Sequence, residues 1–349
     1  MTKRLTLSLD AMGGDQAPRM VVEGIEIAAG RLPDVDYLLV GDERRLMPLL
    51  DRFPKAKSRA QIIHTDAAVA DEDKAASALR NGRGTSMRLA INAVADGRAD
   101  AVISAGNTGA LMAMAKFVFK MLPGIDRPAI VTYFPTQRGA SVMLDLGANV
   151  ECDADNLVQF AVMGEVFARN VLGVMQPSIG LLNVGVEGFK GHDSLRQAST
   201  ILRESALPIK FHGFVEGDDI GEGTVDVVVT DGFTGNVALK TAEGTARMIG
   251  HFLREALNSS AMSKVGAVLA KGALSEFRAH MDPRHYNGAM LVGLNGICVK
   301  SHGSTDELGF ANAISVAANL ITGRVNERIK EDLEHLISGG SAQTAATIP

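Results

Sequence analysis

The chain has 349 residues, enough to bury a substantial core, and its 46% hydrophobic and 21% charged residues are typical of a folded globular protein. Its net charge of −5 argues against nucleic-acid binding, because proteins that bind the phosphate backbone normally display a basic surface. With two cysteines, no signal-peptide pattern and no uncharged apolar stretch of about 20 residues, we expect a cytoplasmic protein with reduced thiols.

Short strand patterns alternate with longer helical patterns along most of the chain. Leu5, Leu7 and Leu9 alternate as a strand, and apolar residues then recur at helical spacing from Val21 to Leu32. Further strands are expected at Tyr37–Val40, Gln61–His64, Ala101–Ser104, Ala129–Phe134, Val142–Leu146, Ile179–Val184, Ile209–Val215, Val225–Thr230, Met290–Leu294 and Ile297–Ser301. The clearest intervening helices are expected at Ser86–Ala95, Asp155–Leu172, Asp193–Ser205 and Gly235–Leu257. This rhythm predicts an α/β fold, a three-layer sandwich with a mainly parallel sheet covered on both faces.

No linker rich in proline or serine divides the chain. We therefore expect residues 1–337 to form one catalytic α/β unit, built either as a single body or as two lobes. Residues 338–349 are small and polar, which predicts a flexible tail.

Glycine-rich polar loops follow six of the expected strands. Glycine lets backbone N–H groups approach a ligand, and Asn, Asp, Ser or Thr caps the next helix, whose N-terminus attracts anions. Any one loop could be an ordinary turn with a helix cap, but six at the same end of one sheet predict an anion site. The loops are Asp10-Ala-Met-Gly-Gly-Asp15, Ser104-Ala-Gly-Asn-Thr-Gly109, Asp145-Leu-Gly-Ala-Asn149, Asn183-Val-Gly-Val-Glu-Gly-Phe-Lys-Gly191, Asp231-Gly-Phe-Thr-Gly-Asn236 and His302-Gly-Ser-Thr-Asp306.

The common nucleotide and hydrolase motifs are absent. The chain has no GxGxxG after its first strand, no GxxxxGK[ST] and no GxSxG. It also has no HExxH and no cluster of histidines and cysteines, so no metal site is expected. Phosphate-type loops without a nucleotide motif indicate free phosphate or a simple phosphoryl compound as the ligand.

Four of these segments, read in order, resemble one family, the bacterial phosphate acyltransferases (acyl-ACP:phosphate transacylases, PlsX). They are Leu9-Asp-Ala-Met-Gly-Gly-Asp15, Ser104-Ala-Gly-Asn-Thr-Gly-Ala110, Leu144-Asp-Leu-Gly-Ala-Asn149 and Val229-Thr-Asp-Gly-Phe-Thr-Gly-Asn-Val237, and Lys300-Ser-His-Gly303 follows them. The resemblance runs from about Leu5 to Ala318. It departs from the family pattern at Val186 and Gly188, where the family carries acidic residues, and at Lys74-Ala-Ala-Ser77.

The resemblance implies reversible transfer of a long-chain acyl group from acyl carrier protein to inorganic phosphate. The acyl phosphate formed would feed the acylation of glycerol 3-phosphate by a membrane acyltransferase in phospholipid synthesis. It also implies a fold like that of phosphotransacetylases and isopropylmalate dehydrogenases, a homodimer, and peripheral contact with the inner face of the cell membrane. No cofactor is implied beyond the phosphopantetheine arm that the carrier protein brings.

Both lines of reasoning predict roles for individual residues. Because phosphate is already a nucleophile, the protein must position it, offset its charge and stabilise the oxyanion on the thioester carbonyl. We expect Lys190 to supply charge and Asn236 to supply a hydrogen bond at the reacting centre. The remaining predicted site residues are Gly13, Gly14, Asn107, Thr108, Thr234 and His302 for phosphate or substrate binding, with Asp10, Asp145 and Asp231 supporting the loops from behind.

Met262, Val265, Val268 and Leu269 share one face of an expected helix. Such a stripe fits a helix lying on a bilayer, and equally a helix packed against a second subunit or a carrier protein. For the function, the alternative within the same fold is a short-chain phosphotransacetylase that uses acyl-CoA. A scaffold that recruits carrier protein without turnover is the non-enzymatic alternative.

Overall fold

The computed structural model describes residues 4–205 and 209–331. Its centre is a continuous sheet of eleven strands, and every strand expected from the sequence is present among these residues. The strands are β1 (Leu5–Asp10), β2 (Val35–Gly41), β3 (Ala60–His64), β4 (Ala101–Ser104), β5 (Ala129–Thr136), β6 (Gly139–Leu144), β7 (Ser178–Leu182), β8 (Lys210–Val215), β9 (Val227–Val229), β10 (Ala289–Val292) and β11 (Ile297–Lys300). The expected tail, residues 338–349, lies outside the described residues.

The sheet has two parallel halves that run in opposite directions. Its order is β3-β2-β1-β4-β11-β10-β5-β6-β9-β7-β8. Strand β10 is antiparallel to both of its neighbours, and β5 is antiparallel to β6. The sheet is therefore mainly parallel, as predicted, but the expectation that all six loops lie at the same end of one sheet is wrong, because the strands before them run in two directions. A tight hairpin between Thr136 and Gly139 reverses the chain and with it the direction of the second half.

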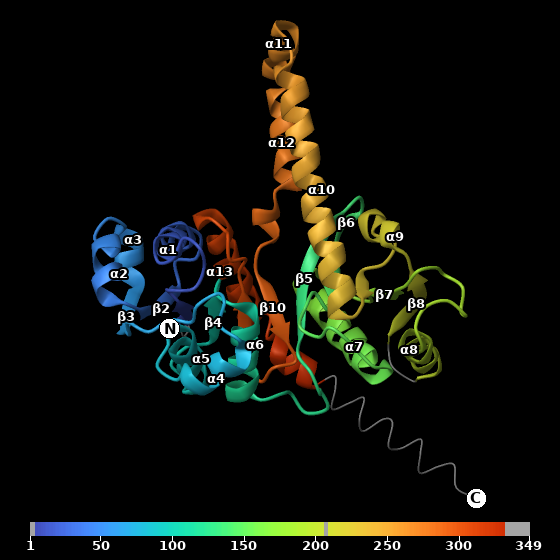
Figure 1. Ribbon diagram of the computed structural model, residues 1–349, viewed down its shortest axis with the longest axis horizontal. Helices are drawn as coiled ribbons and strands as arrows, with labels where there is room; N and C mark the ends of the chain where they lie inside the picture. The colour runs from blue at the N-terminus through green and yellow to red at the C-terminus, as the bar shows by residue number, and fades with distance from the viewer. Residues whose placement is uncertain (1–3, 206–208, 332–349) are drawn as a thin grey trace, which may run out of the picture.

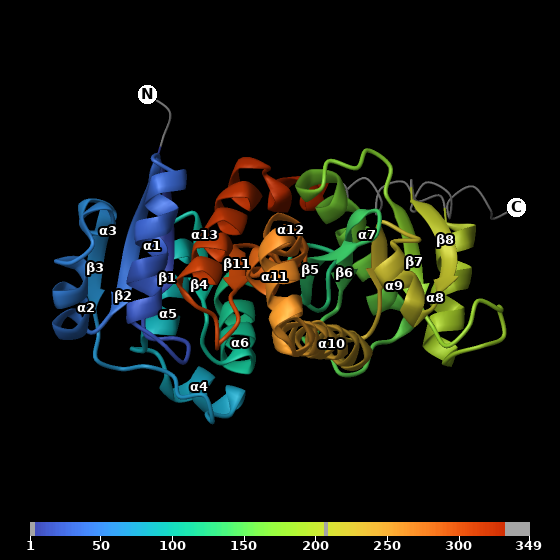
Figure 2. The ribbon, with the colours of Figure 1, turned by 90° about the horizontal axis from the view of Figure 1, so that it is seen from above.

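Helices cover both faces of the sheet, which confirms the three-layer sandwich (Figures 1 and 2). One layer contains α1 (Arg19–Arg31), α2 (Glu43–Leu50), α3 (Pro54–Arg59), α7 (Ala154–Val171), α8 (Asp193–Glu204) and α13 (Glu307–Thr322). The other contains α4 (Ala75–Asn81), α5 (Ser86–Ala95), α6 (Thr108–Phe119), α9 (Gly217–Glu222) and the start of α10 (Gly232–Asn258).

The strands alternate between the two cores with a period of two residues. On β9, Val227 and Val229 pack into one core while Val228 packs into the other. All three are buried, since successive side chains of a strand point to opposite faces and both faces are covered. This explains why the strand at 225–230 reads as almost continuously apolar.

A long helical hairpin projects from the middle of the sheet (Figure 1). It consists of α10, α11 (Ala261–Leu269) and α12 (Lys271–Met281), and a 3₁₀ turn at Pro283–Tyr286 returns the chain to β10. With 27 residues, α10 is about 40 Å long at about 1.5 Å per residue. Its first turns lie against the sheet and its second half stands clear of it.

Candidate active site

A large cavity lies beside the first turns of α10, with a volume of about 1620 Å³. Its walls come from the paired strands β5 and β6, from α10 and from the loop after β11. The loops after β4, β6 and β7 also reach it. Four predicted site residues line the cavity, namely Thr108, Thr234, Asn236 and His302. Loops from both halves of the sheet therefore meet here although their strands run in opposite directions.

Asp231 organises the loop at the start of α10. Its carboxylate accepts hydrogen bonds from the Thr234 amide and from the Thr234 hydroxyl, both at 2.8 Å, and so caps the helix. The helix consequently begins at Gly232, three residues before the predicted start. Asn236 follows one turn later with an exposed side chain that hydrogen-bonds to no other described residue. Its amide is available to a ligand in the cavity.

Asp145 fixes the neighbouring loop from behind. The buried carboxylate accepts hydrogen bonds from the backbone amides of Ile130 (2.9 Å), Ala148 (3.0 Å) and Asn149 (2.7 Å). Burial raises the pKa of Asp145 above its ordinary value, and these N–H donors oppose that rise. A Cβ on Gly235 would come within 1.9 Å of the Asp145 carbonyl oxygen, so only glycine allows α10 to start this close to the loop.

Asp10 supports the first glycine-rich loop in the same way. It accepts hydrogen bonds from the hydroxyls of Ser86 (2.6 Å) and Ser104 (2.7 Å). Burial raises its pKa, and those hydrogen bonds oppose the rise. A Cβ on Gly13 would come within 2.6 Å of the Asp10 carboxylate, and Gly14 has φ of +106°. Both glycines are thus explained by close packing of loops behind the cavity, and neither lines it.

Asn107 uses its side chain within the protein. Its carbonyl oxygen accepts from the Ala110 amide and caps α6, and its NH₂ group donates to the carbonyls of Asp71 (2.8 Å) and Asp73 (2.9 Å). The side chain thereby holds the segment before α4 against the start of α6. Thr108, the next residue, is the one that lines the cavity.

Lys190 lies in the loop after β7, outside the cavity lining. Its ammonium pairs with Glu187 at 3.0 Å, and its side chain is 40% exposed. The side chain of Asn183, which does line the cavity, donates to the Lys190 carbonyl at 3.2 Å. The loop that carries Lys190 is therefore anchored at the cavity edge.

Two lysines on the cavity wall were not singled out from the sequence. Lys240 lies one helical turn after Asn236, and Lys300 is the last residue of β11. Lys300 is half-buried, and its burial lowers its pKa to about 8. Two features of the sequence could have pointed to these lysines. Lys300 is the first residue of the Lys300-Ser-His-Gly303 motif, and Lys240 is four residues after Asn236, on the same face of the expected helix.

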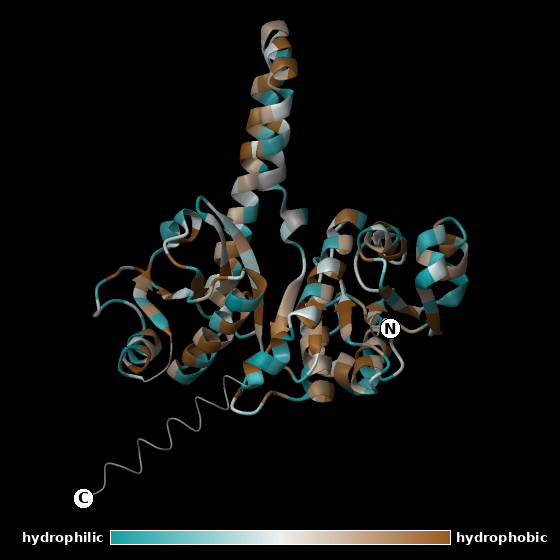
Figure 3. Cartoon of the chain, turned by 180° about the vertical axis from the view of Figure 1, so that it is seen from behind, coloured by the Kyte–Doolittle hydropathy of each residue, from teal (hydrophilic) through white to brown (hydrophobic). Residues whose placement is uncertain are grey.

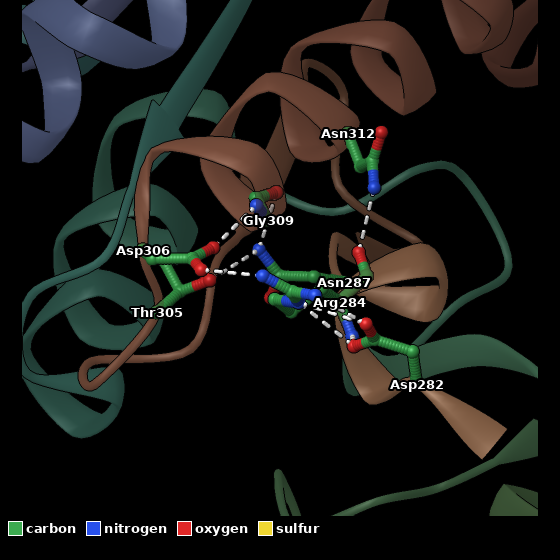
Figure 4. A network of polar contacts seen from close by, with 7 residues as sticks. All are labelled: Asp282, Arg284, Asn287, Thr305, Asp306, Gly309 and Asn312. Atoms are coloured by element: carbon green, nitrogen blue, oxygen red, sulfur yellow. Dashed lines mark hydrogen bonds and ion pairs between the residues drawn. The ribbon is translucent and has the colours of Figure 1, made fainter. Parts of the chain in front are cut away.

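His302 is held in place by the loop around it. Its backbone amide donates to Asn287 at 2.9 Å, and its Nε2 lies 3.1 Å from the Lys240 ammonium. Burial, and then the Lys240 charge, lower the pKa of His302. Figure 4 shows the surrounding network, in which Arg284 pairs with Asp282 and Asp306 while Asn287 donates to Gly309. These contacts tie the base of the hairpin to the loop that carries His302.

Much of the remaining cavity wall is apolar. Side chains from the central strands and from one side of α10 form it, namely Ile130, Tyr133, Phe134, Met143, Leu146, Val237, Leu239 and Ile249. Asn236, Lys240 and His302 form a polar group beside it, and further polar residues such as Gln137, Asp218 and Arg247 also line the cavity. Such a cavity suits a ligand with a polar reacting group and an apolar body.

Among the described residues, no cluster of three or more His, Cys, Asp or Glu side chains could hold a metal ion. None of the described helices is long and apolar enough to cross a membrane.

Comparisons with known proteins agree over almost the whole chain. A family model described as "Fatty acid synthesis protein" matches residues 5–328. A phosphate acyltransferase of Rhodospirillum centenum is 62% identical over 336 residues, which cover 96% of this chain and 95% of that protein. One of Paramagnetospirillum magneticum is 57% identical over 96% of both chains. The chain belongs to the phosphate acyltransferase family. The predicted family is thereby confirmed.

Solved structures confirm the predicted fold as well. The EutD phosphotransacetylase of Staphylococcus aureus aligns with a TM-score of 0.61 at 16% identity, covering 91% of this chain and 94% of that one. A phosphotransacetylase of Streptococcus pyogenes aligns with a TM-score of 0.59 at 16% identity, covering 92% and 95%. At such identities the likeness concerns the fold alone.

Proposed function

We propose that this phosphate acyltransferase moves a long-chain acyl group from acyl carrier protein to inorganic phosphate, reversibly, in the cavity beside α10. The observation that carries the proposal is the cavity itself, in which polar groups at the start of α10 adjoin a long wall that is rich in apolar side chains. The family's place in fatty acid and phospholipid synthesis supports it.

The chemistry requires little acid–base help from the protein. A phosphate oxygen attacks the thioester carbonyl, a C–O bond forms, the C–S bond breaks, and the phosphopantetheine thiolate leaves with the carrier protein. Asn236 is the proposed donor to the oxyanion that develops on the carbonyl, since its amide is free beside the cavity. Lys190 is the proposed source of further positive charge, in the loop that Asn183 anchors at the edge of the cavity. In the reverse reaction the thiolate attacks acyl phosphate and phosphate leaves.

The apolar wall favours a long acyl chain over the short-chain alternative. Asn236 and Ile249 both line the cavity and are 13 positions apart on α10, which is about 20 Å at about 1.5 Å per residue. An extended acyl chain of roughly 16 carbons has a similar length, because its C–C bonds of about 1.5 Å zigzag along the chain. A two-carbon acyl group would leave most of this wall in contact with water.

The exposed tip of the hairpin supports membrane or subunit contact. On α11, Met262 is 79% exposed, Val268 73% and Leu269 83%. Figure 3 shows that hydrophobic and hydrophilic stretches alternate along the hairpin. We propose that the protein is a cytoplasmic homodimer touching the inner face of the membrane, where a glycerol-3-phosphate acyltransferase takes up its product.

A comparison of three acyl donors tests the proposal. The purified full-length protein is given phosphate with palmitoyl-ACP, palmitoyl-CoA or acetyl-CoA at equal concentration, and acyl phosphate is trapped with hydroxylamine. We expect the highest kcat/KM with palmitoyl-ACP. Preference for acetyl-CoA would favour the short-chain alternative, and a lack of turnover with all three would favour a scaffold.

A further inference from the structure

Lys300 presents a cation to the cavity with no carboxylate in direct contact, although the charges of Asp10 and Asp71 favour its charged form. Its ammonium donates to the Ala105 carbonyl at 3.3 Å and to the adjacent Ser301 carbonyl, and it forms no ion pair with any described residue. Since an ammonium carries three N–H donors, one remains for a ligand. Buried and half-buried charges in proteins are normally paired, so this arrangement favours an anion in the cavity.

Two arginines, Arg284 and Arg247, also lie on this wall. Arg284 pairs with Asp306 at 2.9 Å and with Asp282 at 2.5 Å. Arg247 lies 3.8 Å from Glu243 and is 67% exposed. Arg284 is therefore neutralised by two carboxylates, whereas Arg247 stands mostly in solvent and shares Glu243 with Lys240.

Lys240 is held over the same part of the cavity. Its ammonium donates to Glu243 at 2.9 Å and contacts His302 Nε2 at 3.1 Å, which leaves one N–H donor. A charged lysine can only donate to Nε2, which requires a neutral imidazole with its proton on Nδ1, where it faces the Ser304 hydroxyl at 3.0 Å, and the lowered pKa of His302 agrees with a neutral ring. His302 therefore positions the Lys240 ammonium without adding a positive charge of its own. Lys300 is two residues before His302 in the chain, and both lysines line the cavity beside that loop. The charge of Lys240 adds to the effect of burial in lowering the pKa of Lys300, and an anion bound by both would offset this repulsion.

We propose that Lys240 and Lys300 together form the phosphate subsite of this cavity, each donating to one oxygen of inorganic phosphate. The inference rests on the proposed function and names the side chains that would hold its nucleophile. It differs from the glycine-loop cradle expected from the sequence, because Gly13 and Gly14 pack behind the cavity.

The position of this subsite suits attack on a thioester. Asn236 and Lys240 are four residues apart on α10 and both line the cavity, so they share one face of the helix. Side chains at this spacing have Cβ atoms about 5–6 Å apart. A phosphate on Lys240 and Lys300 therefore lies beside a carbonyl that accepts from Asn236, with the acyl chain free to follow the apolar wall.

Binding of inorganic phosphate alone to the full-length protein tests the inference without any acyl donor. Titration calorimetry is run on the wild type, Lys240→Met, Lys300→Met and the control Lys55→Met, which removes an exposed lysine of α3. We expect each cavity variant to weaken phosphate binding about tenfold or more, while the control binds as the wild type does. Unchanged affinity in both cavity variants, or no saturable binding by the wild type, would overturn the inference. Because Lys240 is exposed, its variant remains informative if Lys300→Met fails to fold.

Steady-state kinetics separate this subsite from a merely structural role. Both variants should raise KM for phosphate about tenfold or more and leave KM for acyl-ACP within about twofold. An equal rise in both KM values would contradict the subsite. If the variants lose phosphate binding but the wild type turns over no acyl-ACP, the proposed function fails and the subsite stands.

The pH profile gives an independent signature. Burial lowers the pKa of Lys300 to about 8, Asp10, Asp71 and Cys298 oppose this fall and Lys240 adds to it, so Lys300 is charged below about 8 and neutral above it. The value of kcat/KM for phosphate should therefore fall as pH rises through about 8 in the wild type. Lys300→Arg keeps its charge and should remove that fall. A fall that persists unchanged in Lys300→Arg would show that another group causes it.

Discussion

Replacing Asn236 should separate catalysis from stability more cleanly than any other change in the cavity. Its side chain is exposed, bonds to no other described residue and lies on the cavity wall. We therefore expect Asn236→Ala to change the free energy of unfolding by no more than about 0.5 kcal/mol. The loss of one oxyanion donor should nevertheless lower kcat by about 10²–10³-fold.

The assay follows acyl phosphate formed from palmitoyl-ACP and phosphate, with urea unfolding measured in parallel. Asn236→Asp keeps the shape but replaces the donor with a negative charge beside the phosphate, so its kcat should fall at least as far. Met248→Ala is the matched control, because it removes an exposed side chain of α10 outside the cavity lining. A kcat for Asn236→Ala within threefold of the wild type would refute the oxyanion role.

Three further predictions concern the surroundings of the cavity. Asp145→Ala leaves several buried N–H groups without an acceptor. We expect it to lower the free energy of unfolding by roughly 3–5 kcal/mol. A loss of less than about 1 kcal/mol in urea titrations would contradict the role of Asp145 in holding the loop. Lys190→Ala should slow acyl phosphate formation about tenfold or more in a protein of unchanged stability, and a rate within threefold of the wild type would remove Lys190 from the mechanism. The double variant Val265→Asp, Leu269→Asp should lose co-sedimentation with anionic liposomes while remaining dimeric, and unchanged sedimentation would exclude the α11 tip as the membrane contact.

The sequence predicted the elements of the fold well because each strand is short, apolar and bounded by polar loops. Val225-Asp-Val-Val-Val229 is an example, since only a strand covered on both faces needs so apolar a run. The sequence did not predict the direction of the strands in the second half of the sheet. That direction depends on the hairpin at Thr136–Gly139, and periodicity records which residues are buried without recording which way a strand runs.

The candidate site was predictable to the extent that its residues are local. Asp231, Thr234 and Asn236 belong to one capped helix start, and spacing alone brings them together. Lys240 and Lys300 are 60 positions apart, and each alone looks like an ordinary surface lysine, so only the packing of α10 against the loop after β11 reveals the pair. Asn107 is the opposite case, because its capping bond was foreseeable while its three bonds to the segment before α4 were not.

The most direct test of the central claim is detection of the product. The purified full-length protein is incubated with palmitoyl-ACP and ¹⁸O-labelled inorganic phosphate, and the products are followed by mass spectrometry. We expect palmitoyl phosphate that carries the label, with release of free holo-ACP in equal amount. Release of holo-ACP with unlabelled palmitic acid and no acyl phosphate would contradict acyl transfer to phosphate.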